Sequence, residues 1–191
     1  MGHIPHIIGL TAGLLLSAGP AVGDQHPSPR QLGAHQHGIA ELNLVVEGEV
    51  LLLELTTPAD NLLGFEHRAR SAADKDKLSR TLALLRRGTP LFRPTAAAAC
   101  ELQLAEIDSP LVEGDAQEDH EHAHEEKEEG GGHSEFQLGY RFHCQHPEAL
   151  TGVEVRLWEH FAGFERIHGQ LIGPRGQQRF ELGPDQRRIH F

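Results

Sequence analysis

The chain has 191 residues, 38% of them hydrophobic and 24% charged, which is typical of a globular protein with one ordinary domain or two small ones. Its net charge is −11, and segment 113–135 alone contributes −9, so the rest of the chain is nearly neutral. No basic face is available to neutralise phosphates, which argues against a nucleic-acid partner. The 15 histidines exceed what packing needs and indicate metal binding.

Residues 1–23 have the pattern of a secretory signal peptide. The apolar run 7–18 (IIGLTAGLLLSA) is too short to span a bilayer, and Ala21-Val22-Gly23 forms a small-residue cleavage site. A buried N-terminal helix is the alternative interpretation. No other apolar run could cross a membrane, so we expect an exported, soluble mature protein with no stable membrane insertion after signal removal.

The first predicted elements form a β-hairpin. Alternating apolar residues over 40–46 predict a strand, and Glu47-Gly48 predict a turn. Segment 50–57 (VLLLELTT) is apolar enough for a central strand that ends at Pro58.

An irregular segment, 59–71, separates this hairpin from a predicted helix over 74–87. Leu78, Leu82 and Leu85 recur at helical spacing and form its buried stripe. Acidic residues occupy the first turn and arginines the last. At each end these charges interact favourably with the helix dipole.

Two cysteines indicate how the second half pairs. In an oxidising compartment Cys100 and Cys144 should form a disulfide, with two free buried thiols as the alternative. If strands 96–107 and 136–144 are antiparallel and place the cysteines opposite each other, apolar residues also face apolar residues. This register predicts the pairs Leu102–Phe142 and Leu104–Tyr140. Further strands are expected at 153–157, 167–172, 178–182 and 187–191, with a hairpin turn at 173–176.

These elements predict an α+β fold in which a mainly antiparallel sheet accompanies one main helix, at about 74–87. We expect one domain over 24–191. Its halves, 34–95 and 96–191, both begin with an apolar strand pair. A structural duplication is one interpretation of this similarity.

Segment 113–135 (EGDAQEDHEHAHEEKEEGGGHSE) holds four histidines among eight glutamates and two aspartates. It has no aliphatic side chain larger than alanine, so it cannot bury enough apolar surface to offset the entropy of ordering. We therefore expect a mobile loop. Imidazole and carboxylate at this density suit Zn²⁺. The alternative is a solvated acidic linker. The predicted loop ligands are His120, His122, His124 and His133.

A second candidate site lies outside this loop. His35 and His37 precede the first strand at i, i+2 and share a face there. Asp60, Glu66 or His67 could supply further ligands, because zinc sites commonly combine histidine with carboxylate. The alternative is two exposed histidines in a frayed terminus. A weaker cluster near the last hairpin comprises Glu159, His160, Glu165 and His168.

Nothing in the sequence predicts an enzyme. The run 120–124 (HEHAH) fits the HExxH pattern of zinc proteases, but that motif needs a helix with a buried apolar face, and the flanks here are acidic or glycine. A nucleophile elbow, a P-loop and a dinucleotide-binding fingerprint are absent.

Several motifs in order resemble a known family. They are His35-Gln36-His37-Gly38-x-Ala40-x-Leu42-Asn43, Glu54-Leu55-x-x-Pro58-Ala59-x-Asn61-x-x-Gly64-Phe65-Glu66-His67, Leu91-Phe92, Cys100 and Tyr140-x-Phe142-x-Cys144, with a His/Asp/Glu-rich insert between the cysteines. From about residue 34 onward, the chain resembles the ZrgA-like periplasmic zinc-binding proteins of Gram-negative bacteria.

The resemblance implies a periplasmic protein that captures Zn²⁺ and delivers it to an ABC-type importer or its solute-binding protein. It also implies oxidised cysteines, and it favours His35, His37, Glu66 and His67 as ligands of a folded site. One alternative is a periplasmic metal buffer for zinc, copper or nickel that has no importer. Another is an interaction domain whose acidic loop binds a partner and no metal.

Overall fold

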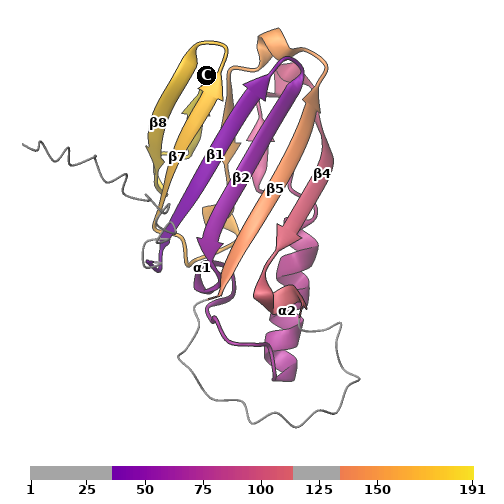
Figure 1. Cartoon of the computed structure of the whole chain (residues 1–191), viewed down its shortest axis with the longest axis vertical. Coiled ribbons are helices and arrows are strands. Elements are labelled where there is room, and N and C mark those ends of the chain that lie inside the picture. Colours follow the sequence, from indigo (N-terminus) through magenta and orange to yellow (C-terminus); the bar gives the residue numbers. More distant parts are fainter. Residues whose placement is uncertain (1–35, 114–133) are drawn as a thin grey trace, which may run out of the picture. The chain divides into compact units, whose positions relative to one another are not determined.

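Strands are the commonest secondary structure in the computed structural model, which describes residues 36–113 and 134–191 (Figure 1). The strands are β1 (Ile39–Glu47), β2 (Val50–Pro58), β3 (Phe92–Pro94), β4 (Cys100–Asp108), β5 (Glu135–Cys144), β6 (Gly152–Val155), β7 (Arg166–Gly173), β8 (Gly176–Leu182) and β9 (Arg188–His190). The helices are α1 (Ala59–Leu63), α2 (Ala72–Leu85) and α3 (Pro110–Glu113), with the 3₁₀ turns η1 (Ala96–Ala98), η2 (Pro147–Ala149) and η3 (Leu157–Glu159). The predicted signal peptide lies outside the described residues.

The expected α+β class with one main helix is wrong. The described residues are 47% strand and 23% helical, and the fold is mainly β. The reason lies in the apolar periodicity, because only the segment of α2 has a long stripe at helical spacing, whereas most other segments alternate with period two. No helix within the described ranges is long and apolar enough to cross a membrane.

Two sheets form the fold. One has six strands in the order β4-β5-β2-β1-β7-β8, and the other has three in the order β3-β6-β9. Neighbouring strands are antiparallel except β1 and β7, which run parallel. β1 and β2 come from the first half of the chain and lie between strands of the second half.

The hydrophobic core lies between these sheets. Leu42 and Leu44 of β1 and Leu51, Leu53 and Leu55 of β2 are at most 1% exposed. They form one cluster with four buried residues of the three-stranded sheet, namely Phe92, Val153, Val155 and Ile189. The alternation expected for the first hairpin is therefore confirmed.

α2 starts two residues before the predicted helix and ends two residues sooner. Ser71 caps it by accepting a hydrogen bond from the Asp74 N–H at 3.1 Å. At the other end the buried Tyr140 hydroxyl donates to the Leu85 carbonyl at 3.0 Å. Burial raises the pKa of Tyr140 far above its ordinary value, so the hydroxyl remains a donor at physiological pH.

The β4–β5 pairing confirms the cysteine register and corrects part of the rest. Cys100 and Cys144 are paired and disulfide-bonded, and Leu102 lies opposite Phe142. The predicted Leu104–Tyr140 pair is wrong, because a register shift between Leu102 and Leu104 places Leu104 opposite Arg141. One extra residue in a strand reverses the direction of every later side chain, so Leu104 is 47% exposed. The strand also starts at Cys100 and not at residue 96.

Removing the disulfide should destabilise the fold without changing it. The bond joins residues 44 apart, for which the chain-entropy model gives an upper figure of about 3–4 kcal/mol. We expect the Cys100→Ala/Cys144→Ala variant to unfold at lower denaturant concentration than the oxidised protein. Reduced wild type is the control and should match the variant. Equal midpoints for oxidised wild type and variant would contradict this account.

Candidate metal centre

Three of the predicted ligands meet near the start of β1. His37 lies in the turn before that strand, Asp60 in α1, and Glu66 in the segment after α1. His37 Nε2 lies 3.2 Å from Glu66 Oε1, and His37 Nδ1 lies 3.7 Å from Asp60 Oδ2. The His37 side chain is 54% exposed and that of Glu66 only 15%, so the imidazole is accessible while the acid beside it is largely covered.

A buried amide holds this turn in place. Asn61 of α1 is 1% exposed, and its Oδ1 accepts a hydrogen bond from the Gly38 N–H at 2.7 Å. Its Nδ2 donates to the Ile39 carbonyl and to Thr57 Oγ1, both at 3.0 Å. Because Asp60 precedes Asn61 in the same short helix, these bonds also set the position of Asp60 relative to His37.

Glu165 supports the turn from a third segment of the chain. The N–H groups of Glu165 and Arg166 donate to the Gly38 carbonyl at 2.8 and 3.0 Å. A Cβ on Gly38 would lie 2.7 Å from the Glu165 carboxyl carbon, and φ is +83° there. Position 38 therefore favours glycine for its backbone conformation, and a larger residue there would also displace the exposed Glu165 side chain.

The two carboxylates act on opposite nitrogens of His37. In a tetrahedral zinc site with bonds near 2 Å, neighbouring ligand atoms lie roughly 3.3 Å apart. His37 Nε2 and Glu66 Oε1 form a hydrogen bond at 3.2 Å, a separation that also fits two ligands of one ion. Asp60 faces Nδ1, where a carboxylate orients a metal-bound imidazole and raises its basicity.

This arrangement is a partial site. Across 36–113 and 134–191, no three His, Cys, Asp or Glu side chains are grouped so that they could hold one metal ion. His37 and Glu66 offer two ligands, and a tetrahedral site needs two more. The remaining ligands would have to come from solvent or from other parts of the chain.

Of the other predicted ligands, His67 is the one within the described residues, and it does not face this cluster. The structure directs His67 Nδ1 toward the Arg68 carbonyl at 2.9 Å and stacks its ring on Phe65 at a centroid distance of 4.8 Å. The predicted ligands that lie outside the described residues are His35, His120, His122, His124 and His133.

The C-terminal flank of segment 114–133 is attached next to Asp60 of the cluster. Before the segment, Leu111 of α3 is buried, and the Ser109 hydroxyl accepts a hydrogen bond from the Leu111 N–H at 3.3 Å. After it, the Ser134 carbonyl accepts a hydrogen bond from the Ala59 N–H at 2.8 Å. Ala59 precedes Asp60, so the residue following His133 is attached to the helix that carries Asp60.

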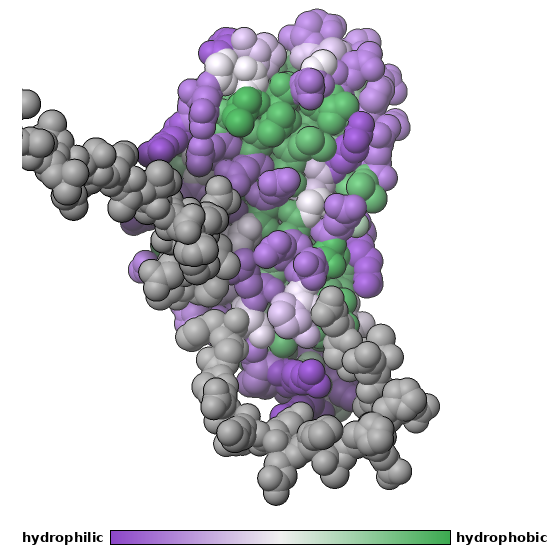
Figure 2. Space-filling model, viewed as in Figure 1, coloured by the Kyte–Doolittle hydropathy of each residue, from purple (hydrophilic) through white to green (hydrophobic). Residues whose placement is uncertain are grey.

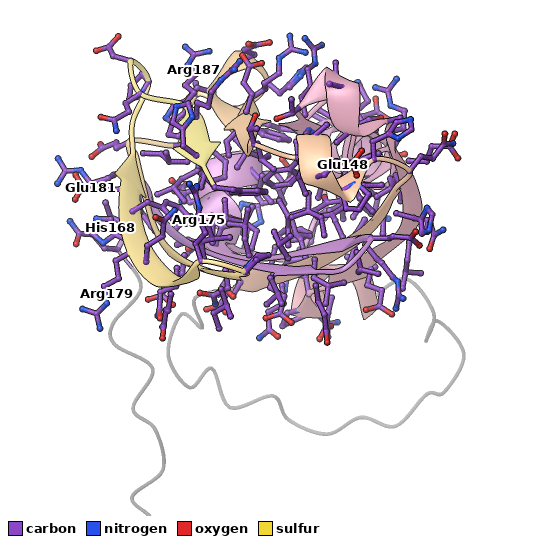
Figure 3. The ribbon with its side chains drawn as sticks, turned by 90° about the horizontal axis from the view of Figure 1, so that it is seen from above. Glu148, His168, Arg175, Arg179, Glu181 and Arg187 are labelled. Carbon is purple, nitrogen blue, oxygen red and sulfur yellow. A yellow bond between two sulfur atoms is a disulfide. The ribbon has the colours of Figure 1, made fainter. Side chains whose placement is uncertain are left out.

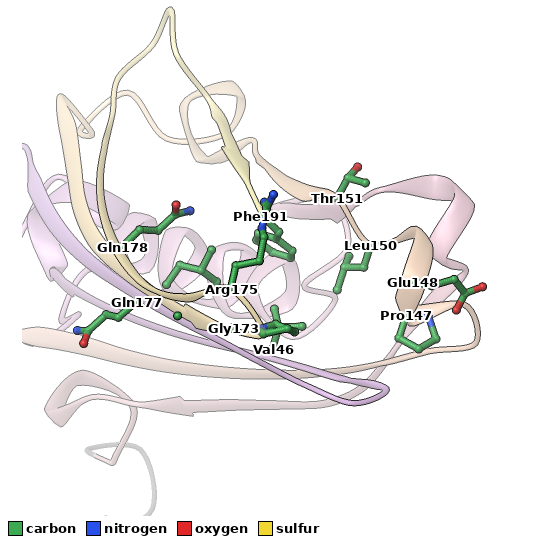
Figure 4. Close-up of a pocket in the computed structure, with 13 residues that line it drawn as sticks. Val46, Pro147, Glu148, Leu150, Thr151, Gly173, Arg175, Gln177, Gln178 and Phe191 are labelled. Carbon is green, nitrogen blue, oxygen red and sulfur yellow. The ribbon is translucent and has the colours of Figure 1, made fainter.

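The weaker candidate cluster near the last hairpin is dispersed. Glu159 pairs with Arg156 and lies 3.5 Å from Arg187, whereas His168 lies 3.8 Å from Glu181 (Figure 3). A separate cavity of about 370 Å³ lies between the β7–β8 turn and the segment around η2 (Figure 4). Glu148 is the sole His, Cys, Asp or Glu in its lining, so the cavity does not suit zinc.

Asn61, Gly38 and Glu165 position the cluster and were not predicted to do so. Asn61 and Gly38 appear in the family-like motifs, but neither is a metal ligand. An amide inside the apolar run of α1 signals a buried hydrogen-bonding role. Nothing in the sequence shows that its partners lie 22 and 23 residues earlier.

Asn61→Ala should lower the free energy of unfolding by about 2–4 kcal/mol, because the Gly38 N–H and the Ile39 carbonyl would lose their buried partner. The matched control is Asn43→Ala, the same change at an exposed position of β1, with an expected effect within about 0.5 kcal/mol. Chemical denaturation measures both. Similar losses in the two variants would refute the proposed role of Asn61.

Comparison with known proteins identifies the chain's relatives. The description of the family that matches residues 34–191 is "ZrgA family zinc uptake protein". A search of the curated proteins gives no match. The family match covers the described cluster and both cysteines as well as segment 114–133, and it extends over well more than half of the sequence. The chain therefore belongs to the ZrgA family of zinc uptake proteins.

Proposed function

We propose that this protein captures Zn²⁺ in the periplasm and delivers it to an ABC-type zinc uptake system. Membership of a zinc uptake family supports the metal and the general role. The observation that carries the proposal is the hydrogen bond from the Ala59 N–H to the Ser134 carbonyl. It attaches the end of the histidine-rich segment beside a partial His–carboxylate site.

Segment 114–133 is the proposed collector. Its sequence provides His120, His122, His124 and His133 among carboxylates, which are ligands of the type zinc prefers. Several overlapping sets of two or three such ligands bind an ion weakly and exchange it readily. The excess of acidic groups also attracts divalent cations from dilute solution.

The cluster of His37 and Glu66 is the proposed holding site. It contributes two ligands, with Asp60 on the second imidazole nitrogen, and leaves two positions for outside ligands. A histidine of the collector or His35 can complete the tetrahedron. Because part of the ligand set is exchangeable, a bound ion can be passed to a competing site more easily than from a closed protein cage.

The location and the partner follow from the same reasoning. The signal-like run 7–18 and the disulfide both suit an oxidising space outside the cytoplasm. A periplasmic zinc-uptake protein needs a membrane transporter to move the ion inward. An ABC importer has that role, and it receives the ion directly or through its solute-binding protein. We therefore propose one of these as the recipient.

Zinc titration by calorimetry separates the two proposed sites. Replacing His120, His122, His124 and His133 with Gln should reduce the number of zinc ions bound. His37→Ala/Glu66→Gln should weaken the tightest site at least tenfold, as loss of ligands or their supports commonly does. The matched control is His146→Ala/Glu148→Gln, which removes another exposed His–Glu pair with a separation of 3.8 Å.

Unchanged binding in both the loop and the cluster variants would refute zinc capture by these residues. Loss of all binding in the loop variant alone would show that the cluster holds no ion by itself and that the histidine-rich segment is the only binding site.

Delivery is tested in the native host under zinc chelation. Deleting the protein should slow growth when the zinc importer is intact. It should cause no further growth defect when the importer is absent, because both proteins act in the same zinc uptake pathway. Added zinc is the control and should restore growth. Independent, additive growth defects, together with induction by excess metal, would instead show a metal buffer.

A further inference from the structure

The outer face of the six-stranded sheet, opposite the core, carries an unusual row of side chains. Inward residues of the central strands β1, β2 and β5 are mostly buried, so the alternate residues point outward. In the strand register, Val45 lies beside Ile172 on one side and Leu52 on the other, and Arg141 lies between Leu52 and Leu104. We call Ile172, Val45, Leu52 and Leu104 the apolar row.

The apolar row contains every large hydrophobic residue that is exposed in the described part of the chain. Leu52 is 36% exposed, Leu104 47% and Ile172 51%. Figure 2 shows apolar surface gathered toward one end of the sheet. Antiparallel sheets commonly have one polar face toward water, and a group of exposed apolar residues with a polar rim is typical of a protein-binding surface.

Acidic residues surround this row. The register and alternation place eight acids and three arginines on the outer face. The acids are Glu41, Glu47, Glu54, Glu101, Glu106, Asp108, Glu135 and Glu181, and the bases are Arg141, Arg166 and Arg179. Of these, Arg179 and Glu181 project outward from β8 beside His168 (Figure 3). The face therefore has an apolar row within a net negative rim.

We infer that the outer face docks a partner protein whose contact surface has an apolar centre and a rim of Lys and Arg. Six strands and about eight residues per strand give a face of roughly 600 Å², close to one side of a standard interface. A second copy would bring like charges together over the whole rim, which is unfavourable. A basic partner gains attraction at the rim and hydrophobic burial at the row.

The outer face of the six-stranded sheet, which we call the docking face, is continuous with the flanks of segment 114–133. Asp108 is the last residue of β4 and Glu135 the first residue of β5, and both lie at one end of this face. The apolar row lies toward the other end of the face, near the turn between β1 and β2, so a partner that covers the whole face would extend from the row to these flanks. Under the proposed function this position suits zinc transfer, but the docking inference itself does not depend on zinc binding.

The test begins with a photocrosslinking amino acid at position 52 of the full-length protein, in its native host under zinc limitation. Position 93, exposed on β3 of the small sheet, is the control. We expect an adduct with another protein that is specific to position 52. That protein is then purified and titrated against wild type and variants at two salt concentrations.

Glu54→Lys/Glu106→Lys should weaken this binding at least tenfold. Asp76→Lys/Glu148→Lys, the same charge change away from the face, should change it less than twofold, and added salt should weaken wild-type binding. Leu52→Gln/Ile172→Gln is a second variant that alters only exposed side chains. An unchanged circular dichroism spectrum would show that each variant folds. An unchanged zinc titration would show that zinc capture does not depend on docking at the outer face.

The inference is overturned if position 52 gives no more adduct than position 93. It is also overturned if the adduct joins two copies of this chain or two parts of one chain, or if the face variants bind the partner as tightly as wild type does.

Discussion

The geometry of the candidate site depends on one buried amide, that of Asn61. Its three hydrogen bonds join α1, the end of β2 and the turn before β1. Its backbone is packed so closely on Gly163 that a Cβ there would lie 2.6 Å from the Asn61 carbonyl oxygen. Four segments thus meet at a residue that cannot bind zinc, and the positions of His37 and Asp60 follow from it. A buried amide serves this purpose well, because an unmade hydrogen bond costs more than a made one contributes.

The sequence predicted those features whose cause is local. Alternation identified β1 and β5, a nearly continuous apolar run identified β2, and one leucine stripe identified α2. The cysteine register also gave the Leu102–Phe142 pair, because matching apolar faces allowed little else. The prediction failed at Leu104, where a bulge that no local pattern signals changed the register. It could not find the parallel pairing of β1 with β7 either, because those strands are more than 100 residues apart and pair through the packing of the whole sheet. The α+β prediction gave the one long helix too much weight against the strands of the two sheets.

The candidate site was foreseen as a set of residues and not as a geometry. His37, Asp60 and Glu66 do come together, but the two acids face different nitrogens, which changes their chemistry from three ligands to two ligands and a supporting group. Spacing in the chain gives no information about which nitrogen a carboxylate will reach. His67 illustrates the same limit, since it neighbours Glu66 in sequence but stacks on Phe65.

The disulfide at one end of the β4–β5 pair has an evolutionary consequence. These neighbouring strands are held together by their ladder and, at one end, by a covalent bond, while segment 114–133 connects them at the other end. The entropy of closing a connection rises slowly with its length, by only about 0.6 kcal/mol for each doubling. Histidines and acids can therefore be gained or lost there by insertion and deletion at little cost to folding. Under the proposed function, the number of ions that this segment holds can therefore change while the sheets and their register stay the same.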